Sequence, residues 1–298
     1  PLAMLNNLQH QAYKVNPLIF AVADHFYDNS ITVGKFRCDP PMPVPENTLT
    51  DDSPEEEVKA YKRRRTDAEN NNAQLAQKNW RTTEVMYVAR KYSTEEQFWM
   101  PASFDYRGRV YFQNTALNPQ GTDFDKSLLY FADEGPVNEY WLAFQVATTF
   151  GHDKETMADR VQWTRDNVSL IDRIASDPIH NHEWRNTSEP WCFLAACLEY
   201  KACILDCTKH TSGLPIGIDA TCSGLQHLSA MTRCGKTAAL VNVSPTDKPA
   251  DAYKTVAEAA KAHLPEQFHD WMNRKVTKRS VMCTPYGVTQ DSARNYIR

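Results

Sequence analysis

The first residue with the potential for chemistry is an aspartate between an apolar segment and a turn. Asp219 follows residues 214–218, which are mostly apolar, and precedes the small residues of 220–224. The apolar segment predicts a buried strand over 214–219, and the end of a strand is a rigid place to hold a carboxylate. The small residues let a bulky ligand approach the backbone. A strand-end aspartate is also a common turn former or helix N-cap, so Asp219 alone leaves the ligand site and the structural role open.

A basic helix near the end of the sequence is the second candidate. Arg274, Lys278, Met282 and Tyr286 are spaced by four residues, and each such step advances about 40° around a helix. Two cations one turn apart, followed by an apolar and an aromatic residue, match a nucleoside triphosphate, with the phosphates on the cations and the base and sugar against the ring. A solvated basic face explains this helix equally well. The spacing therefore predicts a nucleotide site but leaves that simpler interpretation open.

Charge is unevenly distributed along the 298 residues, which carry a net charge of −4. Residues 46–57 contain six acidic residues and no basic one, whereas residues 59–91 contain nine basic and three acidic residues. Residues 274–279 add four basic residues. A phosphate backbone responds to the local field rather than to the net charge. The two basic segments therefore keep a nucleic-acid partner open despite the acidic total.

Eight cysteines raise the question of a metal site or disulfides. None of them forms a Cys-x-x-Cys pair, whereas zinc ligands usually come in pairs about two to four residues apart. We therefore predict that Cys192, Cys197, Cys203 and Cys207 are reduced, small apolar core residues. No run of roughly 18 apolar residues and no signal peptide is visible, so no membrane span is predicted, and we expect both ends to be cuts in a longer protein.

The elements that must position these residues are mainly helical. Residues 37–57 contain five prolines and predict a loop. Hydrophobic periodicity predicts helices over 1–30, 53–91, 138–150, 155–176, 189–207, 225–233, 250–263 and 268–284. Alternation and turn residues predict a turn and strand over 104–112 and strands over 214–219 and 239–243. The predicted fold class is α+β, with the strands gathered in the middle of the chain.

Four motifs in this order resemble the single-subunit DNA-dependent RNA polymerases of bacteriophages and mitochondria, within the polymerase I superfamily. They are Asp-Tyr-Arg-Gly-Arg at 105–109, Asn-Pro-Gln-Gly at 118–121, Ser-Gly-Leu-Gln-His at 223–227, and the basic helix with its Tyr-Gly end at 274–287. The resemblance implies a mostly helical, hand-like polymerase fragment with a small palm β-sheet. Residues 1–95 would be the end of the N-terminal domain and the thumb, 96–246 the first part of the palm, and 247–298 the start of the fingers.

The resemblance also implies a role for each matching residue. Asp219 and the backbone carbonyl of Ala220 would bind two catalytic Mg²⁺ ions, with the second protein carboxylate outside this chain. Lys278 would be the catalytic lysine beside the triphosphate, and Arg274 its phosphate-binding neighbour. The other matches are Tyr286, Gly224 and Lys154 at the incoming ribonucleotide, and Arg107 and Arg109 at the template–product duplex.

The implied reaction is attack of an RNA 3′-hydroxyl on the α-phosphate of an NTP, directed by a DNA template. DNA, RNA and NTPs would be the partners of a monomeric enzyme in the cytoplasm of a phage-infected bacterium or, alternatively, in the mitochondrial matrix. The alternatives are a DNA polymerase of the same superfamily and a non-catalytic nucleic-acid-binding module that uses residues 59–91. Gly224 favours ribonucleotides, because related DNA polymerases carry at this position a glutamate that fills the space of the 2′-hydroxyl.

Two departures from the family pattern carry expectations of their own. Pro285 precedes Tyr286, where relatives have a residue with a free N–H. Because proline removes a helix hydrogen bond, we expect the basic helix to end or kink early. Two-metal phosphoryl transfer needs both carboxylates, so the isolated fragment is expected to be inactive.

Overall fold

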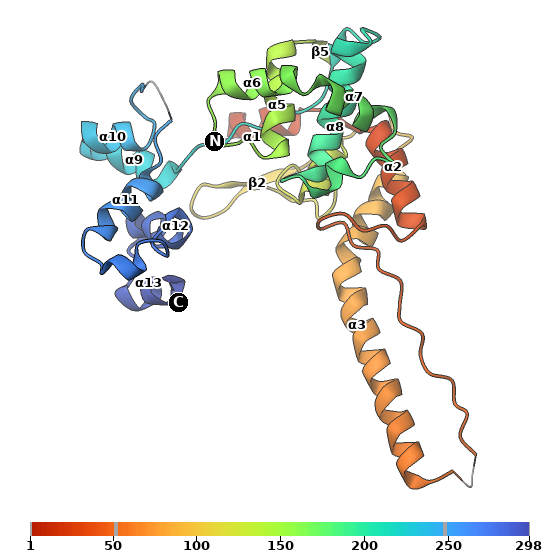
Figure 1. Ribbon diagram of the computed structural model, residues 1–298. Coiled ribbons are helices and arrows are strands. Elements are labelled where there is room, and N and C mark those ends of the chain that lie inside the picture. The colour runs from red at the N-terminus through yellow and green to blue at the C-terminus, as the bar shows by residue number, and fades with distance from the viewer. Residues whose placement is uncertain (1, 51–52, 247–248, 298) are drawn as a thin grey trace. The chain divides into compact units, whose positions relative to one another are not determined.

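The computed structural model describes residues 2–50, 53–246 and 249–297 and divides into two compact units (Figure 1). Unit 1 comprises Pro1–Asp153 and Met157–Ile216, and unit 2 comprises Lys154–Thr156 and Gly217–Arg298. Helices predominate in both units, and the strands form small antiparallel pairs. The predicted α+β, mostly helical class is therefore confirmed. Among the described helices, none is long and apolar enough to cross a membrane.

Unit 1 contains eight α-helices among the described residues and three pairs of short strands. The helices are α1 (Leu2–Gln9), α2 (Pro17–Asp28), α3 (Glu55–Tyr92), α4 (Asp123–Ser127), α5 (Glu139–Phe150), α6 (Met157–Asp166), α7 (Val168–Ser176) and α8 (Pro190–Tyr200). The strand pairs are β1 (Tyr13–Val15) with β4 (Leu129–Phe131), β2 (Ala102–Phe104) with β3 (Val110–Phe112), and β5 (Gly135–Pro136) with β6 (Thr211–Ser212). Their registers place Tyr13 opposite Phe131 and Phe104 opposite Val110.

The core of unit 1 is built around α8, which is apolar apart from Glu199 and buried at every residue except Leu198. A helix that is hydrophobic all round must be enclosed by its neighbours. The rings of Phe26, Phe36, Phe124 and Trp184 surround Trp191, with centroids 5.0 to 5.8 Å away. Three of the four cysteines predicted in the core are buried there, whereas Cys207 is exposed, and the eight thiols are free. The prediction of a core position is therefore wrong for Cys207, which lies beyond the C-terminal end of α8.

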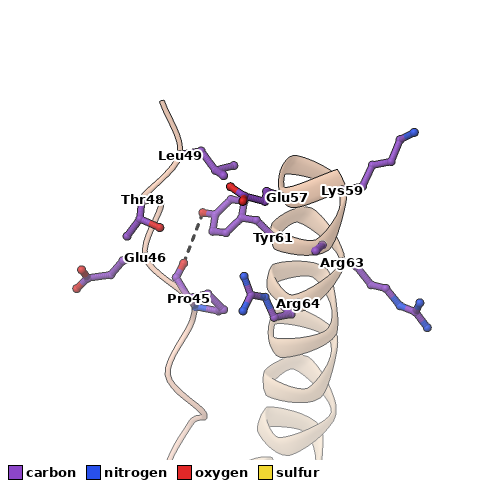
Figure 2. Close-up of a pocket in the computed structure, with 10 residues that line it drawn as sticks. Pro45, Glu46, Thr48, Leu49, Glu57, Lys59, Tyr61, Arg63 and Arg64 are labelled. Atoms are coloured by element: carbon purple, nitrogen blue, oxygen red, sulfur yellow. Dashed lines mark hydrogen bonds between the residues drawn. The ribbon is translucent and has the colours of Figure 1, made fainter. Parts of the chain in front are cut away.

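Helix α3 is long and hydrophilic, in agreement with the helix predicted over 53–91. Such a helix gains little stability from one apolar stripe and needs tertiary contacts. The proline-rich segment that precedes it runs along one face (Figure 1). Asn72 exchanges hydrogen bonds of 2.7 and 2.9 Å with the backbone of Met42, and the Tyr61 hydroxyl donates to the Pro45 carbonyl at 3.5 Å (Figure 2). The loop therefore braces α3 along its length.

The end of α3 nearest the core is held by a partly buried ion pair. Arg81 donates to both carboxylate oxygens of Asp125 at 2.8 and 2.9 Å, and the Asp125 side chain is fully buried. Asp125 also completes a capping box with Thr122 at the start of α4. A bidentate arginine–carboxylate pair adds geometric specificity to its energy. It therefore sets the position of α3 on α4.

A buried polar group secures the segment that leads towards Asp219. Glu199 of α8 accepts hydrogen bonds from the Tyr130 hydroxyl at 2.6 Å and from Lys209 at 3.0 Å. Gly213 directly follows β6, and its carbonyl oxygen accepts a hydrogen bond from the Phe131 amide at 2.8 Å. A Cβ at Gly213 would lie 2.4 Å from the Phe131 carbonyl oxygen, so only glycine permits this approach.

Residues 1–30, which were predicted to be helical, form two helices separated by a short strand. Helix α1 ends at Gln9, β1 follows, and α2 starts at Pro17. The Asn16 side chain accepts the amides of Leu18 and Ile19 and so caps α2. An asparagine cap followed by proline in the first turn is a strong helix start, which explains the interruption.

The strands predicted over 214–219 and 239–243 are both absent. No described segment pairs with residues 214–219, and Ile218 is 72% exposed. Residues 235–240 form a helix instead, and Val241 is buried at its end. A strand requires a neighbouring strand, and among the described residues neither segment is paired with one.

Unit 2 is a helical assembly. It contains α9 (Ser223–Thr232), α10 (Gly235–Leu240), α11 (Ala252–Lys261), α12 (Arg274–Cys283) and α13 (Gln290–Ile297), with short 3₁₀ turns at Glu266–Phe268 and Thr284–Tyr286. The buried Thr277 hydroxyl of α12 donates to the Tyr253 carbonyl of α11 at 2.8 Å. A helix was predicted over 268–284. Helix α12 is shorter, because it begins at Arg274.

Candidate nucleotide site

Helix α12 is oriented by its cap and by its buried face. The Asn273 side chain accepts the amides of Lys275 and Val276 at 2.9 and 3.4 Å. Thr277 faces α11 and is buried, which leaves Lys278 on an exposed part of the helix. The packing of Thr277 therefore places Lys278 away from the face that packs on α11.

Arg274 is held by residues of α11 and its N-cap. Its Nε donates to Oδ2 of Asp251 at 2.5 Å, and its guanidinium lies 5.4 Å from the centre of the Tyr253 ring. Partial burial raises the pKa of Asp251, but the hydrogen bonds from Arg274 and from the Lys254 and Tyr253 amides outweigh this and lower it overall. Asp251 thus remains ionised beside the arginine at neutral pH.

Lys278 differs from its neighbours in the surroundings of its charge. It is exposed and, among the residues that the structure describes, no ion pair engages its ammonium group. The next cation, Arg279, instead lies 4.2 Å from the centre of the Tyr296 ring. One turn after Arg274, Lys278 can therefore meet an anionic ligand without first breaking an internal ion pair.

Tyr286 and Gly224 lie in contact. Helix α12 ends at Cys283, and Pro285 occupies the 3₁₀ turn that carries Tyr286, so the early end expected from the proline is observed. A Cβ built on Gly224 would lie 2.8 Å from the Tyr286 hydroxyl oxygen and 3.2 Å from Cζ. The fold thus brings together the two residues that the resemblance assigns to ribose selection.

Asp219 lies in an irregular, exposed segment together with Ala220. Across residues 2–50, 53–246 and 249–297, no hydrogen bond or ion pair engages the Asp219 carboxylate. A carboxylate and a backbone carbonyl are the hard oxygen ligands that Mg²⁺ prefers, so their chemistry fits that ion. One carboxylate does not complete a two-ion site, which leaves part of such a site to other residues.

The turn after Asp219 is fixed by side chains of the same unit. The Thr221 hydroxyl donates to the Val241 carbonyl at 3.4 Å, and the Gln226 amide donates to the same carbonyl at 2.8 Å. The Asn242 amide donates to the Thr221 hydroxyl at 3.3 Å. Thr221 therefore joins the turn to the end of α10.

Lys154 is exposed and lies in the turn that follows α5. Although its sequence neighbours on both sides belong to unit 1, residues 154–156 group with unit 2. The predicted nucleotide-binding residues therefore share one compact unit.

Arg107 and Arg109 lie at the tip of the β2–β3 hairpin in unit 1. Asp105 organises this tip: its Oδ1 accepts the amides of both arginines at 2.9 Å, and its Oδ2 accepts from the Arg107 guanidinium at 2.9 and 3.0 Å. These hydrogen bonds, led by the Arg109 amide, lower the pKa of Asp105. Gly108 adopts a φ of 76°, which lets the hairpin turn. Both arginines are exposed, and the hydrogen bonds to Asp105 hold the Arg107 side chain in place.

Gln120 explains the second motif of the resemblance. Its side chain accepts the Phe112 amide at 3.1 Å and donates to the Val110 carbonyl at 2.9 Å. It therefore occupies the free edge of β3 and holds residues 118–121 against the hairpin. The motif stabilises the hairpin that presents the arginines.

Three possible metal ligands also meet in unit 1, at a place where no metal site was predicted. Ligand atoms of Asp123, Glu189 and Cys192 lie within 4.8 Å of one another. Both Asp123 oxygens, however, accept amides at the start of α8, from Trp191 at 2.8 Å and from Cys192 at 2.9 Å. Burial and the nearby Asp123 raise the pKa of the Cys192 thiol, which opposes the thiolate that metals bind. The geometry is that of a helix cap.

Asp251 is the residue of the site that sequence reasoning missed. It directly precedes α11, and its Oδ1 accepts the amides of Tyr253 and Lys254 at 3.0 and 3.2 Å. An aspartate before a helical pattern is a known N-cap signal. That signal could have located the cap, although not its contact with Arg274.

Comparison with known protein families shows which family the chain belongs to. Residues 133–298 match the family model of DNA-dependent RNA polymerase, which covers more than half of the chain. The chain belongs to the DNA-dependent RNA polymerase family. Its similarity extends to the single-subunit enzymes of phages and mitochondria, so the resemblance seen in the four motifs is confirmed.

Polymerases from three kinds of source are similar to this chain. A mitochondrial DNA-directed RNA polymerase of Neurospora crassa is 34% identical over 70% of the chain and 16% of its own length. DNA-directed RNA polymerase 3 of the Nicotiana sylvestris chloroplast is 30% identical over 99% of the chain and 32% of its own length. T7 RNA polymerase of Escherichia phage T7 is 31% identical over 85% of the chain and 29% of its own length. The chain thus spans a third or less of each of these relatives.

Proposed function

We propose that this chain carries part of the active site of a DNA-directed RNA polymerase that transfers NMP units from NTPs to an RNA 3′-hydroxyl. The contact between Gly224 and Tyr286 is the observation that carries this proposal. A glycine opposite a tyrosine hydroxyl leaves room for a 2′-hydroxyl and supplies a polar partner for it. This geometry favours a ribonucleotide over a deoxyribonucleotide, and so an RNA polymerase over a DNA polymerase of the same superfamily.

The residues of unit 2 divide the proposed work among themselves. Arg274 and Lys278 bind the triphosphate, and Lys278 neutralises or protonates the pyrophosphate as it leaves. Tyr286 contacts the ribose, and Lys154 lies near the incoming nucleotide. Asp219 and the Ala220 carbonyl hold Mg²⁺, with the second carboxylate in another part of a longer protein. Two bound Mg²⁺ ions supply activation of the attacking hydroxyl and charge stabilisation of the leaving group.

The residues of unit 1 are proposed to contact nucleic acid. The exposed Arg107 and Arg109 present cations at the hairpin tip, where they suit a template–product duplex. Residues 1–95 remain our proposal for the end of the N-terminal domain and the thumb, 96–246 for the first part of the palm, and 247–298 for the start of the fingers. We propose that the enzyme acts as a monomer in a phage-infected bacterium.

The proposal is tested by Asp219→Asn in the longer polymerase. Because the change removes a metal ligand and no phosphate contact, we expect loss of nearly all nucleotide incorporation with largely unchanged binding of a primed duplex. Asp291→Asn is the matched control, since Asp291 is exposed and, among the described residues, pairs with the nearby Arg294. Incorporation by Asp219→Asn at the rate of the control would refute the metal assignment. Duplex binding without incorporation by the control would indicate a non-catalytic nucleic-acid-binding module.

The isolated chain provides a second test. Primer extension with NTPs and Mg²⁺ should yield no templated product, because two-metal phosphoryl transfer needs both carboxylates. Templated extension by the purified 298-residue chain would show that the active site is complete without further segments.

A further inference from the structure

Both oxygens of the Asp251 carboxylate are engaged, and each has a different task. Oδ1 accepts the amides of Tyr253 and Lys254 and thereby caps α11. Oδ2 accepts Nε of Arg274 at 2.5 Å. The cap fixes the carboxylate on the backbone of α11, so the arginine is tied to a rigid point rather than to a mobile side chain.

The contact with Asp251 occupies only one donor of the Arg274 guanidinium. An arginine offers five N–H donors in a planar fork, and the four on its Nη atoms are those suited to paired phosphate oxygens. Among the described residues, no hydrogen bond or ion pair engages these Nη groups. The centre of the Tyr253 ring lies 5.4 Å from the Cζ atom of the guanidinium. The side chain is therefore held at its Nε while its phosphate-binding end stays available.

Asn242 fixes the residue that precedes Asp251. Its side-chain amide donates to the Ala250 carbonyl at 2.8 Å, and its side-chain oxygen accepts the Ala250 amide at 2.7 Å. Asn242 adopts a φ of 61°, a conformation that asparagine tolerates better than most residues. The same amide group donates to Thr221, two positions after Asp219. A continuous set of contacts thus runs from the turn after Asp219 to Arg274.

We propose that Asp251 is a positioning residue that holds Arg274 ready for the NTP triphosphate, and that Asn242 ties this pair to the turn that follows Asp219. The inference rests on the proposed function, because it assumes that Arg274 binds phosphate. Its physical basis is pre-organisation: an arginine already ordered loses less freedom when the ligand binds.

Charge and position make opposite predictions for loss of Asp251. Removing a negative charge near the triphosphate would by itself strengthen binding of the anionic nucleotide. Releasing Arg274 from its fixed place would weaken that binding. A rise in the KM for NTP therefore identifies the positioning role.

Asp251→Ser and Asp251→Asn in the longer polymerase separate this role from helix capping. Serine and asparagine are both good N-caps, so α11 should remain folded. Serine is too short to reach Arg274, and asparagine that caps with its oxygen turns an NH₂ donor towards Nε. We expect both variants to raise the KM for NTP about tenfold with kcat within about twofold, since an interaction made equally in the ground and transition states affects KM alone.

The double variants with Arg274→Ala complete the test. In that background, Asp251→Ser and Asp251→Asn should raise the KM no further, because the residue that they position is gone. An unchanged or lowered KM in the single variants, or full additivity with Arg274→Ala, would overturn the inference while leaving the proposed function intact. If Arg274→Ala alone leaves the KM unchanged, the nucleotide-binding role of α12 itself is wrong. Thermal melting of each variant shows that it is folded.

Discussion

Gly224→Ala perturbs the proposed ribose site with a single methyl group. The new Cβ would lie 2.8 Å from the Tyr286 hydroxyl oxygen, whereas ordinary contact begins at 3.4 Å, so the hydroxyl must move by about 0.6 Å. Tyr286 is 63% exposed, and its ring can move into solvent with little resistance. We therefore expect the variant to fold normally but to displace the hydroxyl from the 2′-hydroxyl that it would contact.

The stability of this variant should stay close to that of the wild type. Gly224 lies in the first turn of α9. Alanine is more stable than glycine by up to about 1 kcal/mol in a helix interior, and by less near a helix end.

The expected change in sugar preference follows from the loss of one hydrogen bond. A hydrogen bond between neutral groups contributes about 0.5–1.5 kcal/mol net. Loss of the hydrogen bond between the Tyr286 hydroxyl and the 2′-hydroxyl should therefore decrease the preference for rNTP over dNTP by roughly 2- to 12-fold, at about 1.4 kcal/mol per factor of ten.

Competition between an rNTP and the matching dNTP at one template position measures this preference in the longer polymerase. Gly235→Ala is the matched control: Gly235 also begins a helix of unit 2, and a Cβ there meets no atom within 4 Å. Tyr286→Phe removes the hydroxyl directly and should reproduce the effect of Gly224→Ala. A folded Gly224→Ala variant with the sugar preference of Gly235→Ala would refute the reasoning.

Three further changes test other parts of the molecule. Lys278→Ala should slow single-turnover incorporation at saturating NTP far more than Arg279→Ala, whose side chain lies on the Tyr296 ring; equal effects would contradict the role of Lys278. Asp123→Ala should lower the free energy of unfolding by about 1–2 kcal/mol through loss of the α8 cap, whereas a chelator should leave the melting temperature of the wild type unchanged; a chelator-sensitive melting temperature would indicate a metal site instead. The lowered pKa of Asp251 means that its contribution to stability is complete above the ordinary value of 3.8 and is lost as the pH falls through the lower value of the folded state. The difference in unfolding free energy between wild type and Asp251→Asn should therefore shrink as the pH falls from 3.8 through the lower pKa of the folded state. A difference that does not change with pH would contradict the ion pair.

Local sequence patterns were sufficient for most helices. The charged region over 53–91 becomes α3, and the helix predicted over 138–150 becomes α5. Capping residues and periodicity act over a few neighbouring positions, so they can be read without knowledge of the fold. The one basic helix that mattered for the site was also found, although its start at Arg274 depends on the Asn273 cap.

The strands were harder to predict than the helices. Residues 214–219 have the composition of a buried strand, yet they form none in the described chain. Whether an apolar segment becomes a strand depends on a neighbour that completes its hydrogen bonds. Composition describes the segment and not the neighbour, which is why this prediction failed.

The sequence predicted that Arg274 and Lys278 lie one turn apart on a helix, because a four-residue spacing is a local property. The contact of Gly224 with Tyr286 and the ion pair of Asp251 with Arg274 emerged only in the folded unit. Both contacts join residues that are distant along the chain, and they form only when α9, α11 and α12 pack together. Periodicity identifies the face of a helix, whereas its partner across a contact depends on how the whole unit packs.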